Sequence, residues 1–215
     1  AQAGAGVVGD LLSHGIDLAQ YLLGSRITEV TAMTDTFITS RPVPLGVGVG
    51  HSAVAVSDER REVENEDYVA ALARTAGGAL VTLESSRVAV GPRAEYVVEV
   101  YGTAGSLRWS FEHPEHLQVL LLDETGHRGY TSVMTEAGYG DYARFQPGPG
   151  QHLSFDDGKV VEARQFLESI LTGHQVAPSA GDAWAAAEAD EAVVASAADR
   201  SWHSVPEVTG TTYAF

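Results

Sequence analysis

The sequence predicts an α+β fold, an open and mostly antiparallel sheet with helices packed on one face. A helical pattern opens the chain at residues 10–23, and two more close it at residues 159–171 and 182–198. Between them lie segments of strand composition, most of them joined by short links. Short links favour antiparallel pairing, because parallel neighbours need long crossovers. The face that the helices leave open must also be covered, and oligomerisation is the ordinary way to cover it.

Composition narrows the class of protein. The chain has 215 residues, 44% of them hydrophobic, which suits one compact domain over residues 1–215. Its formal net charge of −16 disfavours nucleic acid and anionic membranes as partners. The absence of cysteine excludes disulfides, thiolate catalysis and cysteine-ligated zinc, and it fits a cytoplasmic protein. No apolar run approaches the ~18 residues that a membrane span needs.

The first predicted helix, residues 10–23, has one broad apolar face, and we expect that face to lie in the core. The face consists of Leu11, Leu12, Gly15, Leu18, Ala19, Leu22 and Leu23. Gly24 supplies the stop signal.

Six segments then look like strands, and the first of them is rich in Thr, Val and Ile. They are residues 26–40, 66–75, 79–88, 96–101, 106–111 and 117–122. Gly77-Gly78 predicts a tight turn between two of them. Residues 41–58, with two prolines and alternating glycines, predict a mobile loop.

Charged residues mark the starts of the two closing helices. Asp156 and Asp157 stand at the entry to helix 159–171, where the helix dipole favours acids. Asp182 is a plausible N-cap for the alanine-rich helix 182–198.

The letters G-x-G-x-x-G occur at residues 4–9, just before the first helix. A dinucleotide fingerprint needs a buried strand that delivers its glycines to a helix N-terminus, where backbone N–H groups meet pyrophosphate. Only three residues precede these glycines, and the strands that follow run as hairpins rather than as a βαβ unit. We therefore interpret them as a flexible lead-in and assign no cofactor-binding residue to this chain.

Four polar residues, Asp10, His14, Asp17 and Tyr21, are spaced 4, 3 and 4 apart along the first helix. This spacing places them in one stripe opposite the leucine face, so they must point away from the core. An imidazole can take and return a proton near neutral pH, and a carboxylate one turn earlier can orient it. The pair thus has the parts of a general base acting on a hydroxyl.

Other interpretations of these residues stay open. Asp10 could be only a favourable N-terminal acid, and an Asp/His pair four apart could be a solvated contact. A metal ion could also be bound by Asp10, His14 and Asp17, or by His113 with His116. Metal sites in proteins need more ligands converging on one point than either group supplies. We therefore assign no metal site.

The run G-D-L-L-S-H-G-I-D-L at residues 9–18 resembles the active-site helix of the glucose–fructose oxidoreductase / inositol dehydrogenase (Gfo/Idh/MocA) family. The likeness continues in order over most of the chain. It covers residues 21–24, 66–69, 78–80, 84–87, 100–107 and 156–163. The resemblance implies the C-terminal, substrate-side domain of an NAD- or NADP-dependent dehydrogenase of a sugar or polyol. It also implies a homo-oligomer, a dimer or tetramer, formed through the open sheet face.

By this resemblance His14 and Asp10 are the catalytic pair, and Asp17 contacts substrate or supports the pair. The family's Rossmann domain, with its catalytic lysine, is absent from this sequence, and the single lysine, Lys159, fits a helix-entry role. We expect this chain alone not to catalyse hydride transfer. Arg87 and His152 are further candidate substrate contacts, although a salt bridge is an equal alternative for Arg87. The rival function is a non-catalytic module for ligand binding or assembly.

Overall fold

The computed structural model describes residues 6–48, 52–122, 126, 129–144, 148–151 and 155–210. The chain divides into two compact units. Unit 1 comprises Ala1–Ala89 with Ala177–Phe215, and unit 2 comprises Val90–Val176. Helices accompany antiparallel sheets in the chain, which confirms the predicted α+β class.

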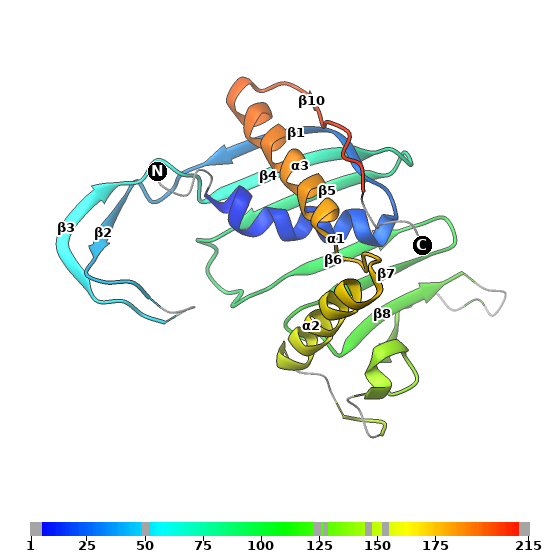
Figure 1. Cartoon of the computed structure of the whole chain (residues 1–215). Helices are drawn as coiled ribbons and strands as arrows, with labels where there is room; N and C mark the ends of the chain where they lie inside the picture. The colour runs from blue at the N-terminus through cyan, green and yellow to red at the C-terminus, as the bar shows by residue number, and fades with distance from the viewer. Residues whose placement is uncertain are drawn as a thin grey trace. The chain divides into compact units, whose positions relative to one another are not determined.

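Unit 1 is built on a four-stranded antiparallel sheet in the order β10-β1-β4-β5, with two helices on one face (Figure 1). The strands are β1 (Ile27–Asp35), β4 (Tyr68–Thr75), β5 (Leu80–Ser86) and β10 (His203–Ser204). The helices are α1 (Ser13–Leu23) and α3 (Ala180–Asp199), and a π-helical turn, η1 (Val8–Leu12), leads into α1. The core lies between the helices and the sheet, where small alanines of α3 allow close packing.

Strand β4 shows how the sheet builds this core. Its residues alternate, with Val69, Ala71 and Ala73 buried against the helices and Leu72 exposed on the opposite face. A tight turn joins β4 to β5, where the Thr75 N–H donates to the Ala79 carbonyl at 3.0 Å. Gly78 adopts a positive φ of 87°, so the Gly77-Gly78 turn predicted from the sequence is confirmed.

The buried side of the first helix differs from the predicted leucine face. Leu12, Ile16 and Gln20 are buried, whereas Leu11 and Leu22 are each 39% exposed, so the broad leucine face was wrong at its edges. The π-helical turn explains part of the shift, because its wider rings rotate successive residues by less than an α-helix does. Gln20 tolerates burial because its side-chain oxygen accepts a hydrogen bond from the Ile27 N–H at 3.0 Å. Gly24 ends the helix at φ 56°, as predicted.

The predicted mobile loop at residues 41–58 is also corrected. Strand β2 (Ser40–Pro44) pairs with β3 (Val56–Glu62) in an antiparallel two-stranded arm that extends from the sheet of unit 1 (Figure 1). The arm escaped prediction because most of its side chains are exposed, so no alternation of apolar and polar residues marks it. Its prolines are compatible with pairing because edge strands tolerate a missing N–H.

Two short features of unit 1 differ from the sequence prediction. The N-cap of α3 is Ser179 rather than Asp182, which instead completes a capping box from within the helix. The Ser179 N–H donates to the Asp182 carboxylate at 2.6 Å, and the Asp182 N–H donates to the Ser179 hydroxyl at 3.3 Å. Strand β10, only two residues long, was too short to leave a sequence signal.

Unit 2 contains a separate antiparallel sheet in the order β6-β7-β8-β9, so the expected single run of strands is divided between sheets. Its strands are β6 (Val97–Tyr101), β7 (Gly105–Ser110), β8 (His116–Leu121) and β9 (Thr131–Met134). Helix α2 (Phe155–Thr172) begins four residues before its predicted start, so Asp156 and Asp157 lie in its first turn. The 3-10 turn η2 (Gly140–Arg144) precedes α2, and its Asp141 pairs with Arg164 of α2 at 2.8 Å.

One carboxyl group of α3 should make unit 1 sensitive to pH. Burial, reinforced by the charge of Glu191, raises the pKa of Asp190 to about 7, and its buried Oδ1 atom has no hydrogen-bond partner in the described structure. A raised pKa in the folded state disfavours the ionised form. The contribution of Asp190 to the free energy of unfolding is therefore fully present below its unfolded pKa of 3.8 and is lost as the pH rises through the folded pKa of about 7.

Replacing Asp190 with asparagine should remove this loss of stability. We expect the unfolding free energy of the variant to exceed that of the wild type by about 1–3 kcal/mol at pH 8, and by about half as much at pH 5.5. Urea denaturation at the two pH values measures the difference. The exposed Asp58→Asn variant controls for the loss of one negative charge, and a pH-independent difference for Asp190→Asn would contradict the assignment.

Candidate functional site

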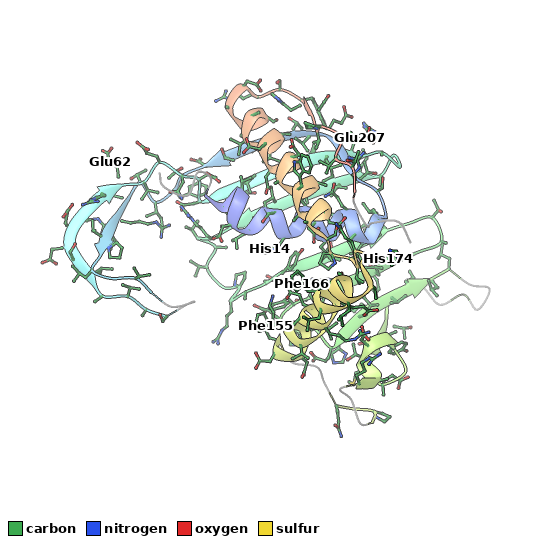
Figure 2. The ribbon with its side chains drawn as sticks, viewed as in Figure 1. His14, Glu62, Phe155, Phe166, His174 and Glu207 are labelled. Atoms are coloured by element: carbon green, nitrogen blue, oxygen red, sulfur yellow. The ribbon has the colours of Figure 1, made fainter. Side chains whose placement is uncertain are left out.

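The polar stripe lies on the side of the first helix that faces away from the core of unit 1. Asp10 and His14 are exposed, Asp17 is half-buried and Tyr21 is 37% exposed. The opposite side carries the buried residues Leu12, Ile16 and Gln20. Figure 2 labels His14 on α1. The structure therefore leaves the imidazole accessible, which a proton-transfer role requires.

The two members of the candidate pair belong to different kinds of helix. Asp10 lies in the π-helical turn η1, whereas His14 is the second residue of α1. The turn is closed by a bond from the Ser13 N–H to the Val8 carbonyl, and the Ser13 hydroxyl donates to the Gly9 carbonyl at 3.1 Å. The spacing of the polar residues predicts one regular helix over residues 10–23, and the π-helical turn departs from that prediction. π-helical turns occur frequently at functional sites.

Glu66, which precedes β4, holds the start of this helix. Its side-chain Oε1 accepts from the Gly6 N–H at 2.7 Å and from the Val8 N–H at 3.0 Å. Its carbonyl oxygen accepts from the Val7 N–H at 3.1 Å. Glu66 lies within the family likeness, but the sequence predicts no role for it, because no local pattern links residues sixty positions apart.

The same contacts decide how the glycine-rich start behaves. A Cβ atom on Gly6 would overlap the backbone oxygen of Glu66, and Gly6 is buried. Gly6 is therefore part of a tight junction rather than a flexible lead-in, which corrects that interpretation. The N–H groups of Gly6 and Val8 are already bonded to a carboxylate, so they do not offer the free donors with which a dinucleotide fingerprint holds pyrophosphate.

A second carboxylate, Asp67, gathers two arginines at the base of the arm. It is fully buried and accepts from Arg87 Nε at 2.8 Å, from Arg41 at 2.9 Å and from the Ile38 N–H at 2.7 Å. Desolvation by burial raises the pKa of Asp67, but the Ile38 N–H, Arg87 and Arg41 outweigh it and lower the pKa below its ordinary value. The structure thus gives Arg87 the ion pair that was the alternative to substrate contact.

The remaining candidates are placed as follows. His152 lies outside the described residues. Lys159 is exposed and pairs with Glu162 at 2.8 Å, which fits a helix-entry role. His116 contacts the Ser132 hydroxyl at 3.1 Å, and the described parts of the chain contain no group of three or more residues able to hold a metal ion. Within those parts, no helix is both long and apolar enough to cross a bilayer.

Comparison with known proteins identifies the family. The model of the GFO/IDH/MocA C-terminal domain matches residues 1–108, half of the chain, and the chain therefore belongs to this family. The matched region contains the polar stripe of the first helix, Glu66, Asp67 and Arg87. The resemblance inferred from the sequence is confirmed.

Individual relatives cover nearly all of this chain. Levoglucosan dehydrogenase of Pseudarthrobacter phenanthrenivorans is 32% identical over 209 residues, which span 96% of this chain and 53% of that protein. Inositol 2-dehydrogenase of Rhizobium meliloti is 24% identical over 93% of this chain and 50% of its own length. A structure of levoglucosan dehydrogenase in complex with NADH and levoglucosan superimposes with a TM-score of 0.84 at 32% identity, covering 95% of this chain and 52% of that one. The chain therefore spans about half the length of these relatives.

Proposed function

We propose that this chain is the substrate-side domain, over residues 1–215, of an oxidoreductase that oxidises a secondary alcohol of a sugar or polyol. The observation that carries the proposal is the exposed His14 on a helix whose opposite side is anchored in the core. The helix lies in the part of the chain that matches the family, whose named relatives are dehydrogenases of levoglucosan and inositol.

In this proposal His14 acts as the general base. Its imidazole accepts the proton of the substrate hydroxyl as the alcohol is oxidised. Asp10, exposed one turn earlier, orients the imidazole or contacts the substrate. Asp17, half-buried one turn later, contacts a neighbouring hydroxyl group. Arg87 and His152 are further candidates for substrate contact, and Arg87 also forms an ion pair with Asp67.

Oxidation of an alcohol also releases a hydride, which in this proposal passes to a nicotinamide dinucleotide. The glycine-rich helix start, which most resembles a site for one, is filled by the Glu66 carboxylate. We therefore propose that NAD or NADP is held by residues outside this chain. The relatives support this proposal, because this chain matches only about half of their length. The solved complexes of levoglucosan dehydrogenase contain NADH, which supports a nicotinamide cofactor. This chain alone would then bind substrate without completing turnover.

A homo-oligomer, a dimer or tetramer, forms part of the same proposal. The sheet face of unit 1 opposite the helices carries Met33, Leu72 and Leu80, which are 68%, 53% and 74% exposed. Apolar side chains on an open sheet face favour burial against another surface, and a second copy is the ordinary choice.

A cytoplasmic location is also part of the proposal.

Turnover by the complete protein that contains this chain tests the function. We expect NADH or NADPH to appear when the protein is mixed with the oxidised cofactor and a panel that includes levoglucosan and inositol. Simple primary alcohols of similar size serve as controls and should react much more slowly. Binding of cofactor and sugar without turnover of any panel member would favour the rival function, a non-catalytic ligand-binding module.

A further inference from the structure

We infer that Glu66 is a positioning residue for the proposed catalytic helix, so that its carboxylate determines where Asp10 and His14 stand. The inference rests on the proposed function, which it deepens. Glu66 meets three consecutive backbone N–H groups at the start of that helix, two through Oε1 and one through its carbonyl oxygen. A carboxylate that accepts two N–H bonds at a helix start forms charge-assisted hydrogen bonds and complements the positive end of the helix dipole.

The segment that carries Glu66 is itself firmly held. The Asp67 N–H donates to the Asp35 carbonyl at 2.8 Å, and the Asp67 carbonyl accepts from the Arg87 N–H at 3.1 Å. On the other side of Glu66, the Asn65 carbonyl accepts from the Thr36 hydroxyl at 3.3 Å. Bonds to Asp35 at the end of β1, to Thr36 directly after it and to Arg87 after β5 thus hold both neighbours of Glu66. The backbone of Glu66 is therefore anchored to the sheet of unit 1.

Backbone hydrogen bonds connect the residues held by Glu66 to the polar stripe. The Asp10 N–H donates to the Gly6 carbonyl at 3.2 Å, and the Ser13 N–H donates to the Val8 carbonyl. Gly6 and Val8 are the two residues whose own N–H groups bond to the Glu66 carboxylate. A shift of the carboxylate would therefore move both Asp10 and Ser13, the residue directly before His14.

The fit leaves little freedom for adjustment. Val7 and Val8 have no exposed surface, and the backbone of Glu66 approaches Gly6 so closely that no side chain fits there. A helix start held this tightly gives the general base one position relative to the substrate. A displacement of about 1 Å in a reacting group can cost about a hundredfold in rate.

Kinetics of the complete protein test the inference with three variants. Glu66→Ala removes both carboxylate bonds, and we expect kcat to fall about 10- to 100-fold while KM changes less than about threefold. Glu66→Gln keeps an oxygen acceptor of the same reach, so it should restore kcat to within about threefold of the wild type. Glu64→Gln, an exposed neighbour with the same change of charge, should match the wild type.

Several results would overturn the inference. One is a wild-type kcat for Glu66→Ala, and another is an equal loss of kcat in Glu66→Gln, which would assign the effect to charge rather than to geometry. If Glu66→Ala does not fold, Glu66→Asp replaces it, because its carboxylate is one methylene too short to reach both N–H groups. Wild-type kcat in Glu66→Asp would then overturn the inference equally.

Hydrogen exchange separates this inference from the proposed function, because it needs no turnover. Exchange of the Gly6 and Val8 amides should be faster in Glu66→Ala and Glu66→Asp than in the wild type, and unchanged in Glu66→Gln. Unchanged exchange in all variants would contradict the positioning role itself. If exchange responds as expected but the wild-type protein oxidises no sugar or polyol, the proposed function fails while the anchoring contact stands.

Discussion

Replacing His14 with alanine in the complete protein should lower kcat by about 10²- to 10⁴-fold, the range ascribed to general acid–base catalysis. The physical reason is the loss of the only imidazole on the polar stripe, which is the proposed proton acceptor. Because His14 is exposed, its removal should change the unfolding free energy by less than about 0.5 kcal/mol. Steady-state production of NADH or NADPH, with urea denaturation in parallel, measures both quantities.

The control for this variant is His174→Ala, which removes an exposed histidine of unit 2 (Figure 2). It should leave kcat and KM at wild-type values. Binding of the nicotinamide cofactor should survive in His14→Ala, because this chain is not proposed to hold the dinucleotide. Undiminished turnover in His14→Ala would remove the general-base assignment and leave the non-catalytic module as the function to test.

Replacing Asp67 with alanine should lower the free energy of unfolding by about 3–5 kcal/mol, more than any other substitution proposed above. The substitution leaves the Arg41 and Arg87 guanidinium groups without their shared carboxylate and the Ile38 N–H without its acceptor. Arg41 is 44% exposed and can recover water, so we expect a value near the lower end of that range. Urea denaturation at pH 7 measures the loss.

The pH dependence of this carboxylate gives a second readout. Because the pKa of Asp67 is lowered in the folded state, its stabilising contribution is present above the unfolded pKa of 3.8 and is lost as the pH falls through the folded pKa. The difference between wild type and Asp67→Asn should therefore be full at neutral pH and shrink below pH 4. Equal unfolding free energies of Asp67→Asn and the exposed control Asp58→Asn at pH 7 would show that the buried cluster does not stabilise unit 1.

Asp67 also joins the arm to the sheet, so its loss should be visible at a distance. Arg41 lies on β2, and its bond to Asp67 is a direct tie between the arm and the start of β4. A two-stranded hairpin is marginally stable by itself. We expect hydrogen exchange in β2 and β3 to quicken in Asp67→Ala more than in the core strand β4.

Four features predicted from the sequence agree with the structure: the α+β class, the Gly77-Gly78 turn, the end of the first helix at Gly24 and the exposure of His14. These features share a physical cause. When one face of an element is buried, apolar residues recur about every 3.6 residues in a helix and every two residues in a strand. Tight turns need glycine at particular positions. Such demands act on neighbouring residues and can be recognised without knowledge of distant partners.

Other features depend on partners far along the chain and could be recognised only in the folded structure. The strands of the arm are mostly exposed, so apolar and polar residues do not alternate along them. The other strands belong to separate sheets, although nothing in their sequences distinguishes the strands of one sheet from those of another. The junction of Gly6 with Glu66 and the cluster around Asp67 join side chains to backbone groups across tens of residues. A buried carboxylate must find donors wherever the fold brings them, and that choice of donors is made by the fold and not by the local sequence.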